Sequence, residues 1–303
     1  MPDGTAATPT IDRKTLAGLS VRSDAAGWRR LGAHALLLIA TGVLVWLARG
    51  TVWLGPAMLV HGIVLVFAFA PLHETIHRTA FAARAANEGV AFVLGALILL
   101  PHEYFRAFHF AHHRFTQDPA RDPELAVPKP ATIGQWLWTA SGLPYWIGQA
   151  RLVLGHAMGR AAEPFYKGED QRRAVIREAR VLLGIYAAVA ALSVAAGSTA
   201  ALVLWVVPAL LGQPALRLFL LAEHTLCPLV PGDMWSNSRT TKSNRLVRFL
   251  TWNMPYHGAH HAYPGVPFHA LPALDQLVAN ERKTTSSGYF AVQKMILAAV
   301  GAK

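Results

Sequence analysis

The sequence predicts an all-α membrane protein with about four transmembrane helices, arranged as two hairpins, and a cytoplasmic helical cap that holds a cage of histidines. Hydrophobic residues make up 53% of the 303 residues and charged residues only 15%, a composition typical of chains that cross a membrane. Four apolar stretches are long enough to cross a hydrocarbon core. Histidines gather near the ends of these stretches, in clusters with helical spacing.

The net charge and the cysteine content exclude several classes of protein. A formal charge of +11 is compatible with nucleic-acid binding, but no nucleic-acid motif is present, so we expect no nucleic-acid partner. The single cysteine, Cys227, cannot form an internal disulfide or supply the ligands of an iron–sulfur cluster. Electrons for any redox reaction therefore have to come from a separate carrier.

The first hairpin follows a polar N-terminal segment. Residues 1–28 contain no long apolar run, and we expect them to be a loose cytoplasmic tail ahead of one membrane domain, residues 29–303. Apolar residues then fill positions 31–47 and 51–72, separated by a very short turn. At 1.5 Å per residue each run covers a hydrocarbon core of about 30 Å when flanking residues help.

A second hairpin follows a shorter apolar stretch. Residues 90–100 are too few to cross the membrane and are expected to be re-entrant or to lie on its surface. Residues 181–196 and 200–221 form the next pair of spans, with kinks expected at Pro208 and Pro214. Lysine and arginine are concentrated outside the two turns between spans, so the positive-inside rule places the termini and the histidine clusters on the cytoplasmic side.

Nine of the fourteen histidines lie in four places: an H-x-x-x-H, two copies of H-x-x-H-H about 150 residues apart, and one isolated histidine. Positions i, i+3 and i+4 of a helix share a face, so each H-x-x-H-H is expected to present three imidazoles in one direction. Nine nitrogen ligands exceed the needs of one ion, which predicts two metal ions. The predicted ligands are His73, His77, His109, His112, His113, His224, His257, His260 and His261.

The metal is predicted to be iron. A structural zinc ion takes four ligands and a hydrolytic zinc ion three, so two copies of H-x-x-H-H would be surplus to a zinc site. Iron accepts nitrogen-rich coordination, and a pair of irons can use O2 against an unactivated C–H bond. Carboxylates near the H-x-x-x-H and H-x-x-H-H motifs, which we call histidine boxes, are candidates to orient the imidazoles by accepting their free N–H groups. These are Asp118, Asp122 and Glu124, in a turn-rich loop, together with Glu74; His102 is a further supporting candidate. The alternative for the three loop residues is an ordinary solvated loop.

The order of the four histidine motifs, on a topology of four spans, resembles the membrane-bound fatty acid desaturase and hydroxylase superfamily over roughly residues 31–272. Residues 101–106 and 253–257 are similar to its bacterial, desaturase-like branch, which includes enzymes of small-molecule pathways. The resemblance implies a multi-pass protein of the bacterial inner membrane. It also implies a non-haem di-iron centre that uses O2 to desaturate or hydroxylate an acyl, alkyl or small-molecule substrate.

The resemblance also implies how the site is completed. We assign four ligands to one iron and five to the other: His73, His77, His112 and His260, and His109, His113, His224, His257 and His261. Leu220 stands where stearoyl-CoA desaturases have an Asn, so water or Asn253 is expected to complete that position. No fused cytochrome b5 domain is present, which implies a ferredoxin, rubredoxin or similar carrier with its reductase, docking on the basic cytoplasmic face.

Two other classes of protein fit parts of this pattern. His73-Glu74-Thr75-Ile76-His77 is also H-E-x-x-H, the helix motif of zinc metalloproteases, but an intramembrane protease leaves most clustered histidines without a role. A non-enzymatic metal transporter is the second alternative. Transport sites lie near the bilayer midplane, whereas these clusters are expected at the cytoplasmic ends of the spans.

Overall fold

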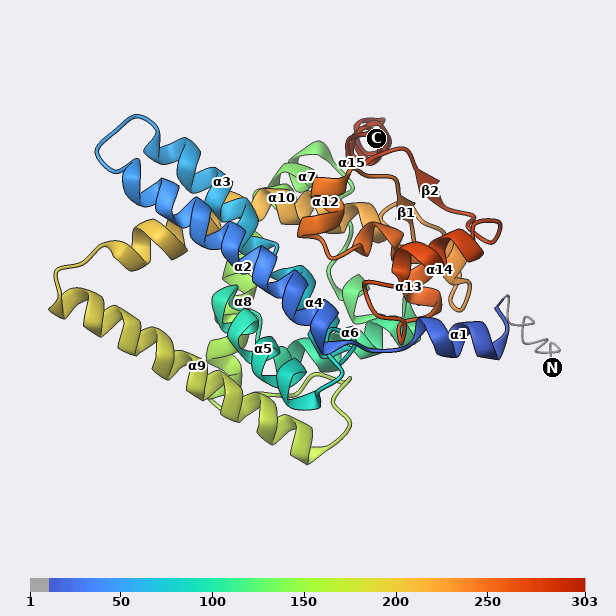
Figure 1. Ribbon diagram of the computed structural model, residues 1–303, viewed down its shortest axis with the longest axis horizontal. Helices are drawn as coiled ribbons and strands as arrows, with labels where there is room; N and C mark the ends of the chain where they lie inside the picture. The colour runs from blue at the N-terminus through green and yellow to red at the C-terminus, as the bar shows by residue number, and fades with distance from the viewer. Residues whose placement is uncertain (1–10, 303) are drawn as a thin grey trace.

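The computed structural model describes residues 11–302, and the fold is built almost entirely from helices (Figure 1). Within the described residues the strands are β1 (Thr240–Thr241) and β2 (Thr285–Ser286), which pair in parallel. The all-α prediction is confirmed.

Four helical segments are long and apolar enough to cross a membrane, as predicted. They are α2 (Asp24–Leu47), α3 with α4 (Leu54–Val66 and Phe69–Ile76), α9 (Glu169–Ala195), and η2 with α10 (Leu202–Val206 and Val207–His224). Segments of 23 residues cover about 35 Å, enough for a hydrocarbon core of about 30 Å. The chain is therefore a membrane protein. In Figure 1, α2 and α3 lie side by side, whereas α9 stands apart from them.

The N-terminal segment differs from the prediction. Residues 1–10 lie outside the described residues, but residues 13–19 and 24–28 are helical and do not form a loose tail. Helix α1 (Arg13–Leu19) begins where Asp12 Oδ1 accepts hydrogen bonds from two backbone N–H groups, and Ser23 caps α2 in the same way. Capping side chains satisfy N–H groups that a helix start leaves free, so both helices begin at polar residues.

Helices α3 and α10 approach so closely that two glycines are needed. A Cβ atom on Gly62 would lie 1.9 Å from the carbonyl oxygen of Pro208, and one on Gly212 would lie 2.1 Å from the carbonyl carbon of Gly62. Because the backbones touch, larger side chains at either position would force the helices apart. This contact fixes the helix that leads into α4 against the helix that ends at His224.

Two buried histidines satisfy backbone carbonyls inside the spans. Pro208 has no N–H, so the carbonyl of Leu204, four residues earlier, lacks its helical partner. His61 Nε2 donates to that carbonyl at 2.9 Å, and His34 Nε2 donates to the carbonyl of Val64 at 3.1 Å, near the break between α3 and α4. The chain before Pro208 is a π-helical turn, η2, in place of a regular α-helix.

The shorter elements lie between and beyond the spans. The chain bends by 101° between α5 (Arg84–Leu97) and α6 (His102–Phe115). The apolar residues 90–100 therefore do not form a straight membrane span. Between α6 and α9 lie η1 (Pro123–Ala126), α7 (Ile133–Ala140) and α8 (Leu143–Ala157).

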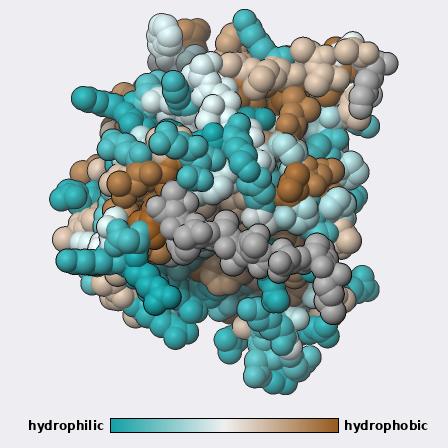
Figure 2. Space-filling view, turned by 90° about the vertical axis from the view of Figure 1, so that its right-hand side faces the viewer, coloured by the Kyte–Doolittle hydropathy of each residue, from teal (hydrophilic) through white to brown (hydrophobic). Residues whose placement is uncertain are grey.

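Residues 225–302 form a unit that we call the cap. It contains β1, β2, α11 (Met234–Asn237), α12 (Arg245–Leu250), η3 (Met254–Tyr256), α13 (His257–Ala262), α14 (Leu271–Leu277) and α15 (Tyr289–Gly301). Figure 1 shows most of these elements gathered on one side of the molecule, with α13 among them. Figure 2 looks onto that side and shows many hydrophilic side chains interrupted by hydrophobic patches.

Candidate metal centre

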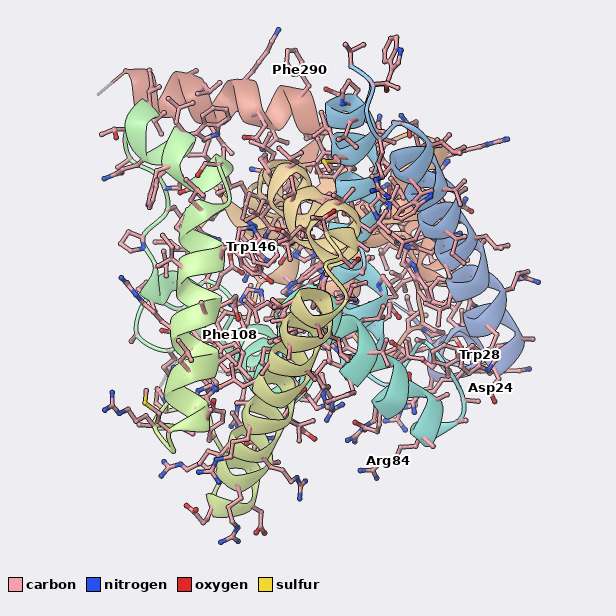
Figure 3. The ribbon with its side chains drawn as sticks, turned by 90° about the vertical axis from the view of Figure 1, so that its left-hand side faces the viewer. Asp24, Trp28, Arg84, Phe108, Trp146 and Phe290 are labelled. Atoms are coloured by element: carbon pink, nitrogen blue, oxygen red, sulfur yellow. The ribbon has the colours of Figure 1, made fainter. Side chains whose placement is uncertain are left out.

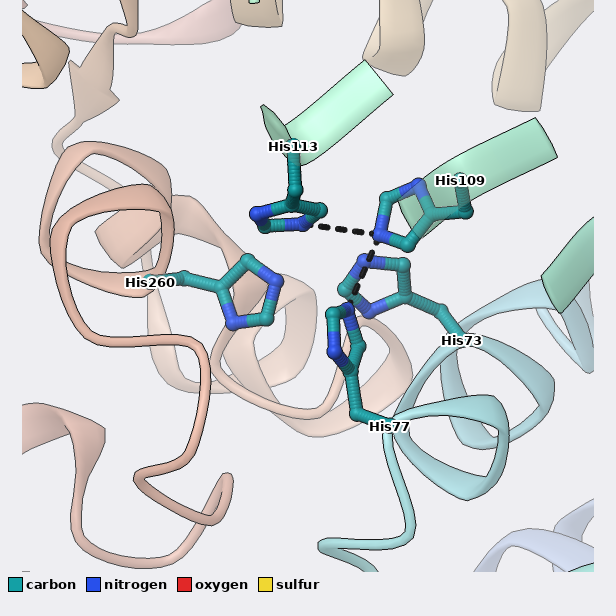
Figure 4. Close-up of side chains that lie close together, drawn as sticks. All are labelled: His73, His77, His109, His113 and His260. Atoms are coloured by element: carbon teal, nitrogen blue, oxygen red, sulfur yellow. Dashed lines mark hydrogen bonds between the residues drawn. The ribbon is translucent and has the colours of Figure 1, made fainter. Parts of the chain in front are cut away.

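The structure brings the nine predicted histidines together in two adjacent groups, although they come from four separate helices. The five-histidine group is drawn in Figure 4 and consists of His73, His77, His109, His113 and His260. The second group contains His112, His224 and His261, and its fourth member is His257, whose Nε2 lies 2.8 Å from His224 Nε2. Within the five-histidine group, and within the first three members of the second group, potential ligand nitrogens all lie within 4.8 Å of one another.

Each H-x-x-H-H divides its three imidazoles between the groups, which corrects the prediction that all three point in one direction. The first box gives His109 and His113 to the five-histidine group and His112 to the other. The second box gives only His260 to the five-histidine group. Positions i and i+4 lie about 40° apart around a helix, while i+3 lies about 60° to the other side, so the boundary between the groups runs between them.

This grouping differs from the predicted partition of ligands at three positions. His112 belongs with His224, whereas His109 and His113 belong with His73. The groups nevertheless share a border, because the ring of His113 stacks on that of His261 with 4.1 Å between centroids.

The ring nitrogens have the geometry of ligands. His109 Nε2 lies 3.0 Å from His77 Nε2 and 2.9 Å from His113 Nε2, and one ring hydrogen can satisfy only one of these contacts. Both nitrogens of the buried His260 and Nε2 of His261 have no hydrogen-bond partner among the described residues. Buried polar atoms are normally paired, so the convergence of unpaired nitrogens fits bound cations.

Burial also keeps the rings in the form that binds metal. It lowers the pKa of His77 to about 3 and holds the pKa values of His109, His113 and His260 well below the ordinary value for histidine. Neighbouring rings lower the last three further, because a second positive charge nearby is unfavourable. These rings are therefore neutral at pH 7, with lone pairs available for a metal ion.

Asp122 orients one of the histidines. Its Oδ1 accepts from His112 Nδ1 at 2.9 Å, which leaves Nε2 of that ring facing His224 Nε2 at 3.2 Å. Asp122 is itself held in place, since its oxygens accept from the backbone N–H groups of Gln117 and Glu124. Glu124 Oε2 lies 3.4 Å from the same His112 nitrogen and Glu124 also pairs with Lys129.

Replacing Asp122 with alanine is expected to lower metal affinity or activity by about 10- to 100-fold, the usual effect of removing a carboxylate behind a ligating histidine. Asp122→Asn keeps an acceptor for His112 Nδ1 and is expected to lose less. Asp118→Ala is the matched control, because it lies in the same loop but pairs with Arg121. Metal content and turnover of the three variants check this, and equal losses for Asp118→Ala and Asp122→Ala would contradict it.

Four predicted supporting residues do not contact the histidine groups. Asp118 caps its own loop and pairs with Arg121, so it points away from the imidazoles. Asn253 adopts a left-handed backbone conformation with φ of 64°, and its amide donates to the carbonyl of Phe268. A role for either residue at the metal is not supported.

The remaining two corrections concern Glu74 and His102. Glu74 follows His73 by one position, so it lies on another face of α4, where its carboxylate accepts from Thr79 Oγ1 at 2.7 Å and from the N–H of Phe268. The structure therefore gives no support to Glu74 as the base of a zinc protease. His102 stands two helical turns before His109, about 10 Å away along the axis, which is too far to assist a ligand.

His102 instead reveals a contact that the sequence did not predict. The carboxylate of Glu178, on α9, accepts from the backbone N–H groups of His102 and Glu103 at 2.8 Å each, and from His102 Nδ1. Helix α6 has no capping side chain of its own, since Pro101 precedes it. Glu178 therefore caps the helix that carries the first H-x-x-H-H.

Glu178→Gln is expected to destabilise the protein by about 2 kcal/mol, because hydrogen bonds to a buried charged acceptor typically contribute about 1.5–3 kcal/mol each and the amide keeps one acceptor. Thermal unfolding in detergent measures this, with Glu169→Gln, an exposed residue at the start of α9, as the control. An unfolding midpoint of Glu178→Gln equal to that of the control would show that the hydrogen bonds from Glu178 to the start of α6 do not stabilise the protein.

A cavity of about 290 Å³ opens against the histidines. Four of its lining residues are the ligand candidates His73, His109, His112 and His257. Much of the remaining wall is apolar or aromatic, and Leu100, Tyr104, Phe105, Phe108 and Met254 contribute to it. In Figure 3, Phe108 lies close to α8, the helix that carries Trp146. Trp146 lines a separate apolar groove between the spans. An apolar ligand can therefore lie next to the metal-binding groups.

The comparison with protein families agrees with this geometry. A family model described as fatty acid desaturase matches residues 51–292, so the chain belongs to the fatty acid desaturase family. No curated protein matches the chain. The protein is therefore an oxidoreductase whose histidine groups can hold metal, and the protease and transporter alternatives have no support from the family match.

Proposed function

We propose that the protein is an O2-dependent di-iron oxidoreductase that removes hydrogen from an unactivated C–H bond and gives a desaturated or hydroxylated product. The observation that carries this proposal is the pair of adjacent groups, of five and four imidazoles, on the wall of an apolar cavity. Together the nine imidazoles exceed the four ligands of a single zinc site. Family membership supplies the class of reaction.

Two iron ions bound there would supply the reduction of O2 and the abstraction of hydrogen. The protein's own residues position these ions: His73, His77, His109, His113 and His260 would hold one, and His112, His224, His257 and His261 the other. Asp122 keeps the hydrogen of His112 on Nδ1, and the carbonyl of Asn237 does the same for His224 at 2.9 Å. Both Nε2 atoms are therefore free to bind metal.

The cavity wall decides which bond reacts. Apolar side chains such as Phe105 and Phe108 exclude water and align the substrate, so its chain lies against the histidines in a fixed direction. A fixed direction selects the carbon that reacts. The placement of that carbon against the histidines would decide whether the product is an alkene or an alcohol.

The proposal includes the cellular setting. We place the protein in a bacterial inner membrane with its termini and histidine groups on the cytoplasmic side, because positive residues avoid the turns between spans. An acidic one-electron carrier, a ferredoxin or rubredoxin with its reductase, would dock on the basic cytoplasmic surface.

Product analysis tests the proposed reaction. The purified protein, loaded with iron and supplied with a reductant and isotopically labelled O2, is expected to oxidise a short acyl or alkyl substrate, with label in any alcohol and none in any alkene. His269→Ala, at an exposed position outside both groups, is the control that keeps activity. Absence of any O2-dependent product from a fully iron-loaded sample would contradict the proposal.

A further inference from the structure

Arg217 is a charged residue on a membrane-spanning helix, and it lines the cavity that holds the histidines. It precedes His224 by seven residues on α10, which places the two side chains on the same side of the helix, about 10 Å apart along its axis. Ionisable residues on spanning segments are rare and usually serve the binding of a substrate or ion. Arg217 therefore requires a partner.

Among the described residues, the groups that contact the Arg217 guanidinium directly are uncharged. Its guanidinium lies 4.4 Å from the centre of the Tyr145 ring. With the amide of Gln213 oriented so that its oxygen faces the guanidinium, Gln213 accepts from Nε at 3.1 Å and from a terminal nitrogen at 3.2 Å. No carboxylate among residues 11–302 forms an ion pair with Arg217, whereas the other cation of the cavity, Lys129, pairs with Glu124.

The two carboxylates of the cavity lie at its histidine end. Glu124 Oε2 is 3.4 Å from His112 Nδ1, and Glu223 Oε1 is 3.3 Å from His257 Nδ1. Glu124 is already paired with Lys129, so its charge is balanced inside the protein. Arg217 is the lining cation with no carboxylate ion pair among residues 11–302, so it is the cation of the cavity that is open to a ligand's carboxylate.

The shape and lining of the cavity define the rest of the ligand. Its volume of about 290 Å³ is at the lower end of the roughly 300–1,000 Å³ typical of small-molecule sites, so the ligand is small. Between Arg217 and the histidines the wall includes Leu100, Tyr104 and Phe108, which suit an apolar chain. A guanidinium presents parallel N–H donors that match the two oxygens of a carboxylate.

We propose that Arg217 binds the carboxylate of a short-chain organic acid and so holds one carbon of that chain against the histidine groups. This inference rests on the proposed function, because it names the substrate class of the same site. Binding by Arg217 would distinguish a free acid from an alkane or an acyl thioester, because neither of these carries a carboxylate at the end of its chain.

Binding without turnover tests the inference. Isothermal titration calorimetry of the full-length, metal-loaded protein in nanodiscs, without reductant, compares hexanoate with 1-hexanol and hexyl phosphate. We expect hexanoate to bind at least tenfold more tightly than 1-hexanol, the usual discrimination for hydrogen bonds to a charged group. Arg217→Gln is expected to bring this ratio to about one without changing the affinity for 1-hexanol, and Arg217→Lys to keep part of it.

The control is Arg151→Gln, which removes an exposed arginine from α8 and is expected to leave the ratio unchanged. A ratio near one in the unsubstituted protein would overturn the inference without any variant. A preference for hexanoate that survives Arg217→Gln, or tighter binding of hexyl phosphate than of hexanoate, would also overturn it. These results differ from a failure of the proposed function, which would appear as missing iron or missing O2-dependent product.

Discussion

His260→Ala is expected to abolish oxidation and to lower the iron content from about two ions per chain to about one. His260 is the only member of the second H-x-x-H-H in the five-histidine group, and neither of its ring nitrogens has a hydrogen-bond partner among the described residues. Removing it therefore breaks no hydrogen bond but removes a ligand. The loss of activity should exceed the 10- to 100-fold typical of residues behind the ligands.

Iron analysis and turnover measured on the same sample check this expectation, with His269→Ala as the control. His269 is exposed and belongs to neither histidine group. The four histidines of the second group are intact in His260→Ala, so one iron should remain bound. Full activity with two irons in His260→Ala would show that His260 is not a metal ligand.

Acid is expected to destabilise the protein steeply, beginning below about pH 6.5. Burial holds the pKa of His77 at about 3, and those of His109, His113 and His257 well below the ordinary value of 6.5. In the unfolded chain these rings take up protons near pH 6.5, while in the folded protein they stay neutral. Stability is thus unaffected above that pH and falls as pH drops through it, by up to about 1.4 kcal/mol per pH unit for each ring.

Thermal unfolding between about pH 8 and pH 5 measures this dependence, because most carboxylates titrate below that window. The unfolding midpoint should be nearly constant from pH 8 to pH 7 and then fall, with and without metal. Bound metal should raise the unfolding midpoint at neutral pH. This gain should shrink as pH falls, because protons compete with the metal for the rings. His269→Ala should follow the same curve, and equal midpoints at pH 5 and pH 8 would contradict neutral buried rings.

The membrane spans and the clustering of the histidines could be predicted because their signals are local. Apolar runs of span length and histidines three or four positions apart are visible in any short window, and the structure places all nine predicted histidines in two groups. How each box is divided could not be predicted, because it depends on where the other helices cross α6 and α13. His109 and His112 share a box but face different groups for that reason.

Supporting residues were harder to predict because their partners lie far away in the sequence. Asp118 and Asp122 have the same side chain in one loop, and only the fold decides that Asp122 faces His112. Glu178 lies 76 residues from the α6 backbone that it caps, inside a helix that looks like an ordinary span. Arg217 was visible as a charge in a span, but its cavity forms only when α8 and α10 come together with α6.

The most direct test of the di-iron proposal is the identity and number of metal ions in protein purified in mild detergent, by elemental analysis with Mössbauer spectroscopy. The proposal predicts about two irons per chain, spin-coupled and in nitrogen-rich coordination, as expected for groups of five and four imidazoles. One zinc ion per chain with no iron would contradict it.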